Sequence, residues 1–175
     1  MIVVHIDTQE DTSHLKCLYE GLEGVTLLYN PTRNEVENAV KSIDDKCIMF
    51  LGHGCSSGLF GTKDAFIIDG RNADLFKDKE IIGIWCYACN FAERYGLHGY
   101  FTSMFISNAG EASYFGFNDC DEQDIYNEID VFCNSIRSFI DSKTEMKEWV
   151  PILHEQCHKE KPFVSFNYKS MKFFQ

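Results

Sequence analysis

The first 51 residues alternate short apolar runs with amphipathic segments, and this alternation constrains the fold more than any other feature. The apolar runs, rich in β-branched residues, cover 2–6, 25–29 and 46–51. The segments between them, 11–22 and 31–43, repeat apolar residues at helical spacing. Continuous apolar runs are typical of strands buried on both faces of a sheet. This order of strand, helix, strand, helix and strand predicts a parallel sheet with helices on both sides.

The remainder of the chain adds further predicted elements. They are a β-hairpin around Thr62-Lys63-Asp64, a short helix over 71–77, a strand over 80–85, a helix over 91–107 interrupted near Gly96 or Gly99, a strand over 111–117, helices over 122–141 and 143–158, and a last strand over 162–168. No linker or repeat divides the 175 residues, so we expect one domain over 1–175. The fold class that follows is α/β, a three-layer α/β/α sandwich with a mostly parallel sheet.

Composition excludes several classes of partner. The net charge is −11, from 16 Lys and Arg against 27 Asp and Glu, so the surface would repel nucleic acid and anionic lipid. No apolar run approaches the roughly 20 residues that cross a bilayer. The eight cysteines sit in strand-like and helix-like stretches, and the first residues read as a strand rather than a signal peptide. We therefore expect reduced thiols in a cytoplasmic protein.

Two apolar runs end in side chains capable of covalent chemistry. Residues 46–51 lead into His53-Gly54, and residues 80–85 lead into Cys86-Tyr87-Ala88-Cys89. The carboxyl ends of neighbouring parallel strands meet at one edge of a sheet, which is where such folds place their functional groups. A thiol becomes a nucleophile beside a histidine or a helix N-terminus, and a helix is expected just after Cys89. The N–H groups of Gly54 and Cys89 are candidates to hold an oxyanion.

This layout resembles the caspase-like cysteine peptidases, which include caspases, metacaspases, clostripain, gingipains, separase and the bacterial CHAT domains. The resemblance is carried by Phe50-Leu51-Gly52-His53-Gly54, by Gly58-Leu59-Phe60-Gly61, by Ile84-Trp85-Cys86-Tyr87-Ala88-Cys89 and by Pro162-Phe163-Val164-Ser165-Phe166. It covers most of the chain in order of elements and is closest in layout to the CHAT and clostripain types. The resemblance implies a caspase-like fold and an endopeptidase that cleaves proteins or peptides without a cofactor or catalytic metal.

Carried over to this sequence, the family's base matches His53 and its nucleophile matches Cys89. Cys86 is the competing nucleophile. Cys89 is preferred because the family's cysteine follows a small residue just past the strand, as Cys89 follows Ala88. The sequence departs from relatives in having Asn90-Phe91 after the cysteine, and Tyr87 where clostripain-like enzymes have Asp. These departures concern the substrate pocket and leave room for an inactive relative.

The residue before the scissile bond is recognised in this family by an acidic or a basic pocket. Asp119 and Asp121 belong to an acidic loop, together with Glu122 and Asp124, that follows the strand expected over 111–117. Such a run is usually a solvated face. With the net charge of −11, it favours a basic residue at that position, with Asp119 and Asp121 as the substrate-binding residues.

Other readings of the same residues remain open. A non-catalytic interaction domain would keep the fold without the chemistry. Trp85-Cys86-Tyr87-Ala88-Cys89 resembles the thioredoxin motif, although that chemistry gives His53 no role. Cys86 and Cys89 have zinc-ligand spacing, but His98, Cys120 and the cluster at 154–158 form no matching second pair. The glycines at 52, 54 and 58 suggest a dinucleotide loop, which would require a helix where a hairpin is expected.

Overall fold

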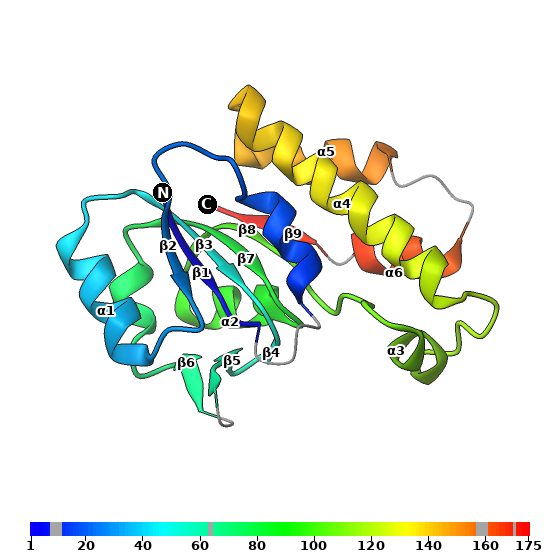
Figure 1. Ribbon diagram of the computed structural model, residues 1–175, viewed down its shortest axis with the longest axis horizontal. Helices are drawn as coiled ribbons and strands as arrows, with labels where there is room; N and C mark the ends of the chain where they lie inside the picture. Colours follow the sequence, from blue (N-terminus) through cyan, green and yellow to red (C-terminus); the bar gives the residue numbers. More distant parts are fainter. Residues whose placement is uncertain (8–11, 63–64, 157–160, 170) are drawn as a thin grey trace.

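Six strands form one central sheet in the order β2-β1-β3-β7-β8-β9 (Figure 1). The computed structural model describes residues 1–7, 12–62, 65–156, 161–169 and 171–175. The strands are β1 (Ile2–His5), β2 (Thr26–Tyr29), β3 (Cys47–Leu51), β7 (Glu80–Ile84), β8 (His98–Phe101) and β9 (Lys172–Phe174). The first five are parallel and β9 is antiparallel to β8. The predicted strands at 2–6, 25–29, 46–51 and 80–85 are confirmed.

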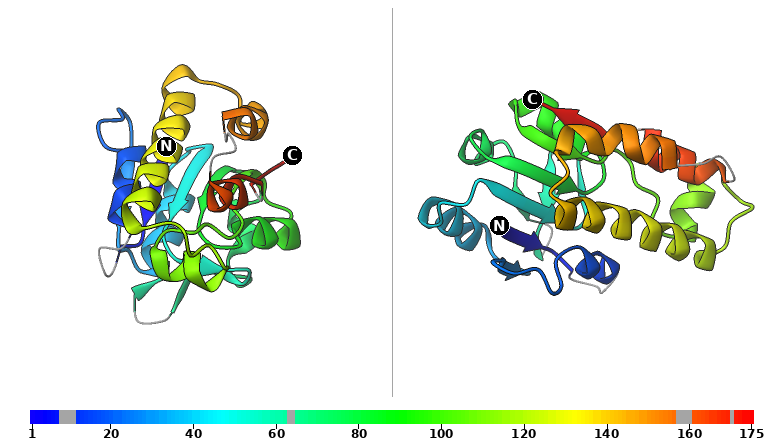
Figure 2. Two further views of the ribbon diagram at one scale, coloured as in Figure 1. Left: turned by 90° about the vertical axis from the view of Figure 1, so that its right-hand side faces the viewer. Right: turned by 90° about the horizontal axis from the view of Figure 1, so that it is seen from above.

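Helices cover both faces of this sheet (Figure 1, Figure 2). On one face α1 (Arg33–Ser42), the 3₁₀ helix η3 (Ala73–Phe76) and α2 (Ala88–Tyr95) contribute to one apolar cluster. On the other, the 3₁₀ helix η1 (Ser13–Leu18), α4 (Glu122–Ser142), α5 (Met146–Gln156) and α6 (Pro162–Lys169) contribute to a second. Alternate residues of each central strand enter the two clusters. The α/β class with a mostly parallel sheet is confirmed, and the arrangement is compatible with a three-layer sandwich.

The predicted helix over 31–43 forms as α1, and its start is set by local chemistry. Thr32 and Glu35 make a capping box, in which the Thr32 N–H donates to the Glu35 carboxylate at 2.7 Å and the Glu35 N–H donates to the Thr32 hydroxyl at 3.4 Å. Val36 and Val40 lie one turn apart and are buried against the sheet. The capping box and the apolar stripe therefore both favour this helix.

A small antiparallel sheet stands beside the main one. It consists of β4 (Gly54–Cys55), β5 (Gly58–Phe60) and β6 (Phe66–Ile68), which confirms the hairpin expected around 62–64, although residues 63 and 64 lie outside the described residues. The Arg33 guanidinium fixes β6 to α1 through two hydrogen bonds to the Asp69 carboxylate, at 2.6 and 2.9 Å. The small sheet therefore starts directly after His53 and is anchored at its far end.

The segment between β7 and α4 differs from the expectation. The helix expected over 91–107 is confirmed only up to the interruption expected near Gly96 or Gly99: α2 ends at Tyr95 and Gly96 caps it with a φ of 64°. The part beyond Gly96 is wrong, because β8 follows there. The strand expected over 111–117 is also wrong, because that segment contains the helix α3 (Ala109–Tyr114). Asn108 starts α3 by accepting a hydrogen bond from the Glu111 N–H at 2.9 Å. Here a cap overrides the strand preference of the aromatic residues.

The strand expected over 162–168 is also wrong, because this segment is helical. Residues 162–168 alternate like a strand, but Pro162 opens the helix α6, in which Phe163, Val164, Asn167 and Tyr168 are buried at helical spacing. The last strand is β9, further along the chain. The helices expected over 122–141 and 143–158 are confirmed as α4 and α5, with residues 157 and 158 outside the described residues. In the described part of the chain, no helix combines the length and apolar character needed to cross a bilayer.

Candidate active site

His53 and Cys86 leave the central sheet side by side. Strands β3 and β7 are neighbours in parallel register, with Leu51 opposite Ile84. The Gly52 N–H then donates to the Ile84 carbonyl at 3.2 Å, so the pairing extends one residue past β3. His53 and Cys86 each lie two residues beyond the paired positions and line the same pocket. The expected meeting of a histidine and a cysteine at one sheet edge is therefore present, with Cys86 as the cysteine.

The pocket between these two side chains is small. Its lining comprises Thr12, His14, Leu15, Gly52, His53, Ile84, Trp85, Cys86, Phe105 and Ser107. Its volume is about 30 Å³, which is enough to hold a water molecule. Such a space admits a reacting carbonyl group but not a whole side chain.

Burial keeps the Cys86 thiol neutral at rest. Its sulfur donates to the Phe105 carbonyl at 3.8 Å, and burial raises the pKa of this thiol to about 11. A neutral thiol is a weak nucleophile, so Cys86 needs a base that accepts its proton as it attacks. His53 lines the same pocket and is the residue type that performs this role.

The turn that presents Cys86 is held by the segment following β8. Tyr87 has a φ of 64°, in the left-handed region that non-glycine residues enter at a cost of order 1 kcal/mol. Its N–H donates to the Ser103 carbonyl at 3.0 Å. The buried Thr102 hydroxyl donates to the Trp85 carbonyl at 2.9 Å. These bonds fix a tight strand-to-helix turn with Cys86 at its start.

Two backbone N–H groups at this edge can receive an oxyanion. Gly54 occupies a non-hydrogen-bonded position of the β4–β5 ladder, because the Phe60 N–H donates to the His53 carbonyl at 2.8 Å and bonded positions alternate. The Cys86 N–H has no acceptor among the described residues, whereas the neighbouring N–H groups of Trp85 and Tyr87 do. Gly54 therefore remains a candidate oxyanion donor, and Cys86 supplies a second candidate donor.

Gly54 is required at its position for steric reasons. A Cβ atom there would lie 2.2 Å from Cδ1 of Trp85 and 2.6 Å from the Gly58 carbonyl oxygen. Trp85 is itself fixed, since its indole N–H donates to the Cys55 carbonyl at 3.3 Å. The indole thus clamps the start of the hairpin against β7.

The structure does not bring Cys89 to this pocket. Cys89 is 3% exposed and belongs to the apolar cluster beneath α2, and its thiol donates to the Asn90 amide oxygen at 3.4 Å. Its N–H donates to the Thr102 carbonyl at 2.9 Å, so the oxyanion role expected of it is wrong. The physical reason is that α2 already begins at Ala88, which turns position 89 towards the sheet.

The two aspartates expected to bind substrate also lie elsewhere. Asp119 lines a separate cavity of about 540 Å³ that is bounded by residues 116–120 and 161–163. Asp121 is the N-cap of α4 and accepts a hydrogen bond from the Asp124 N–H at 2.8 Å. Neither residue lines the His53 pocket. Helix capping explains Asp121, and with both carboxylates away from the His53 pocket they provide no argument for a basic substrate side chain.

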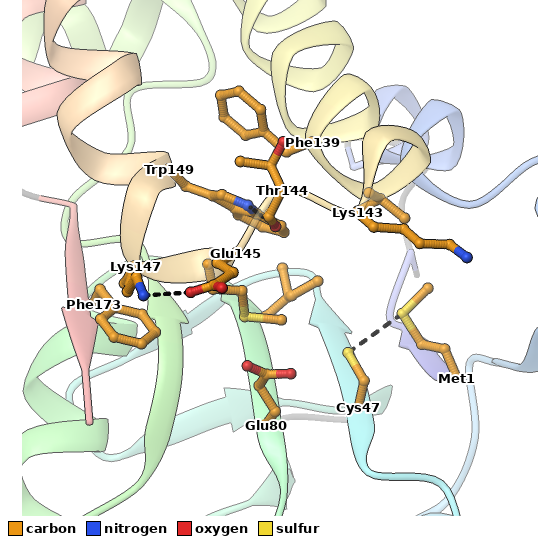
Figure 3. A pocket seen from close by; sticks show the side chains of 13 residues that line it. Met1, Cys47, Glu80, Phe139, Lys143, Thr144, Glu145, Lys147, Trp149 and Phe173 are labelled. Atoms are coloured by element: carbon orange, nitrogen blue, oxygen red, sulfur yellow. Dashed lines mark hydrogen bonds and ion pairs between the residues drawn. The ribbon is translucent and has the colours of Figure 1, made fainter.

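A larger cavity opens at the opposite edge of the sheet (Figure 3). Its volume is about 550 Å³, and it lies at the amino ends of β3 and β7, where Cys47 and Glu80 begin the strands. The Cys47 thiol contacts the Met1 sulfur at 3.7 Å, and burial raises the pKa of this thiol to about 12. The cavity is separated from His53 by the length of the strands and is therefore not part of the candidate site.

In the described part of the chain, no three His, Cys, Asp or Glu side chains gather as a metal site would require. The seven described cysteines are free thiols. Cys86 and Cys89, with zinc-ligand spacing, have different surroundings, one in the pocket and one in the apolar core.

Several residues of the site were missed by sequence reasoning. They are Thr12, His14, Thr102, Phe105 and Ser107. The last three fall in the segment expected to be helical, whereas β8 ends at Phe101 and the chain continues past the site. The available signal was the interruption expected near Gly96 or Gly99, since a glycine inside a periodic segment weakens a helix, but it did not indicate that a strand follows. A scan against models of protein families finds no match, and a search of curated proteins also finds none.

Proposed function

We propose that this protein is a cysteine peptidase with a caspase-like fold, in which Cys86 is the nucleophile and His53 the base. The observation that carries the proposal is the convergence of both side chains on one pocket from neighbouring, in-register strand ends. The order of elements around the pocket supports it: strand, His-Gly, hairpin, short helix, strand and cysteine. The same order motivated the resemblance to caspase-like peptidases.

In the proposed reaction, a peptide lies across the pocket with one carbonyl group inserted. His53 accepts the thiol proton while the Cys86 sulfur attacks the carbonyl carbon. The N–H groups of Gly54 and Cys86 hold the developing oxyanion. The protonated His53 then donates its proton to the leaving amine, and water hydrolyses the thioester that remains on Cys86. No step requires a metal or a cofactor.

A second candidate function is a non-catalytic interaction domain that retains the fold. It is favoured by the resting state of the thiol, whose pKa is raised by burial to about 11, and by the small volume of the pocket, about 30 Å³. A thiol-disulfide oxidoreductase using Cys86 and Cys89 is supported less well. The buried position of Cys89 and the placement of His53 beside Cys86 both favour hydrolytic chemistry over it.

A panel of peptidyl acyloxymethyl ketones carrying Arg, Lys, Asp or an apolar residue before the electrophile tests the proposal. After labelling, the modified cysteine is mapped by peptide mass spectrometry. We expect the label on Cys86, and we expect His53→Ala to abolish it. Cys55→Ser and Cys89→Ser are matched controls, because one thiol follows Gly54 and the other is the rival within the motif. Both controls should label normally.

Three results would count against the proposal. Labelling of Cys89 in the wild type that is retained in Cys86→Ser would identify Cys89 as the nucleophile. Absence of labelling across the whole panel, with Cys86 still reactive to a small alkylating agent, would favour the interaction domain. Reversible formation of a Cys86–Cys89 disulfide with insulin reductase activity would favour the oxidoreductase.

A further inference from the structure

We infer that Cys17 and Cys133 form an oxidation-sensitive thiol pair, which hydrogen peroxide converts into a disulfide linking η1 to α4. These residues are 116 positions apart in the chain (133 − 17) and have no part in the proposed hydrolysis. The inference stands apart from the peptidase proposal, because neither thiol lines the pocket that contains His53 and Cys86.

The packing of η1 against α4 brings the two cysteines together. Cys133 is fully buried in the apolar cluster on this face, and Cys17 packs against that cluster while remaining half-buried. Arg137 lies one turn after Cys133 on α4, and its guanidinium donates to the carbonyls of Cys17 and Glu20 at 3.1 and 2.6 Å. The face of α4 that carries Cys133 therefore faces the end of η1.

Each of the two thiols affects the pKa of the other, and their different exposure assigns them different roles. A hydrogen bond from the Cys133 thiol lowers the pKa of Cys17, although burial and the nearby carboxylates of Asp130 and Glu20 oppose this effect. The same interaction, together with burial, raises the pKa of Cys133. Cys17 is the more accessible thiol and is assigned the initial attack, and Cys133 is assigned the resolving role.

The oxidation balances with hydrogen peroxide as the oxidant. The Cys17 thiolate attacks one peroxide oxygen, the O–O bond breaks, and a sulfenic acid and hydroxide form. The Cys133 sulfur then attacks the Cys17 sulfur, so that an S–S bond forms and the S–O bond breaks. The departing hydroxide leaves as water with the Cys133 proton. Overall, two thiols and one peroxide give one disulfide and two water molecules.

This pair is connected to the candidate active site through η1. The Cys17 thiol donates to the His14 carbonyl at 3.1 Å, and His14 and Leu15 line the pocket that contains His53. Disulfide formation removes the proton of that hydrogen bond. Oxidation would therefore alter the attachment of one wall of the pocket without modifying His53 or Cys86.

The test exposes the reduced full-length protein to increasing hydrogen peroxide, alkylates the remaining thiols under denaturing conditions and maps the cysteines by mass spectrometry. We expect a peptide linked through Cys17 and Cys133 and sensitive to reduction. Cys17→Ser should abolish the linked peptide, and Cys133→Ala should leave a sulfenic acid on Cys17 that dimedone traps. Cys120→Ser is the matched control, because it removes another half-buried thiol and should leave the link intact.

Oxidation of other cysteines with Cys17 and Cys133 still alkylated as free thiols would overturn the inference. A disulfide joining Cys17 to any other cysteine would overturn it as well. Circular dichroism of Cys17→Ser and Cys133→Ala, compared with the wild type, ensures that the mapping is done on folded protein.

Discussion

His5 is a buried histidine whose protonation should control the acid stability of the fold. It lies at the end of β1 with no exposed surface. One ring nitrogen, Nε2, lies 3.1 Å from the Thr12 carbonyl, so this nitrogen carries the proton and donates. The other, Nδ1, lies 3.0 Å from the Tyr19 hydroxyl and accepts. The neutral imidazole is therefore fully satisfied, and burial lowers the pKa of His5 from 6.5 to about 4.

The magnitude follows from this difference in proton affinity. In the unfolded chain His5 takes up a proton as the pH falls through 6.5, whereas in the folded protein it stays neutral until the pH reaches about 4. Acid therefore favours the unfolded chain over this window. Each tenfold change in affinity is worth about 1.4 kcal/mol. The free energy of unfolding should thus lose about 3 kcal/mol between pH 7 and pH 4 through His5 alone.

Urea unfolding followed by circular dichroism at pH 7, 6, 5 and 4 measures this loss. His5→Gln is the comparison, because glutamine can donate to Thr12 and accept from Tyr19 but does not titrate. The wild-type and variant stabilities should converge by about 3 kcal/mol as the pH falls from 7 to 4. Parallel pH profiles for the two proteins would refute the assignment of a neutral, buried His5.

Three further predictions follow from the site and its supports. The rate at which iodoacetamide alkylates Cys86 should rise with pH up to about 11, where its pKa lies, and a plateau near neutral pH would contradict the role of burial. Gly54→Ala should cost about 1 to 3 kcal/mol in urea unfolding because its Cβ would overlap Trp85, and an unchanged midpoint would contradict the clamp. Arg33 and Arg71 hold the pKa of the Asp69 carboxyl well below its usual range, so its ionised form stabilises the fold above about pH 4 and that contribution is lost as the pH falls further. Asp69→Asn should therefore be less stable than the wild type at pH 7 by about 1 to 3 kcal/mol, with a difference that narrows in acid.

Strands β1, β3 and β7 were predictable because they are buried on both faces of the sheet and read as continuous apolar runs. His53 was predictable for the same reason, since a strand end followed by glycine and a hairpin is visible in the sequence. The choice between Cys86 and Cys89 depended on where α2 begins, and helix starts are uncertain by a residue or two. The structure starts α2 at Ala88, which leaves Cys86 in the turn and places Cys89 in the core.

The remaining wall of the pocket could not be predicted because it depends on tertiary contacts. Phe105 and Ser107 reach the site after β8, a strand of four residues with glycine at its second position. Because β8 is short and its residues have a low strand preference, the sequence does not distinguish it from the helical patterns around it. The turn around Tyr87 is likewise fixed by distant partners, Thr102 and Ser103, rather than by its own sequence.

Hydrolysis of a diverse peptide library by the wild type, Cys86→Ala and Cys89→Ala tests the central claim most directly. The cleavage products are identified and quantified by mass spectrometry. The wild type and Cys89→Ala should cleave the same bonds at similar rates, and Cys86→Ala should be slower by about a thousandfold or more. Cleavage that survives in Cys86→Ala and disappears in Cys89→Ala would contradict the assignment of Cys86 as the nucleophile.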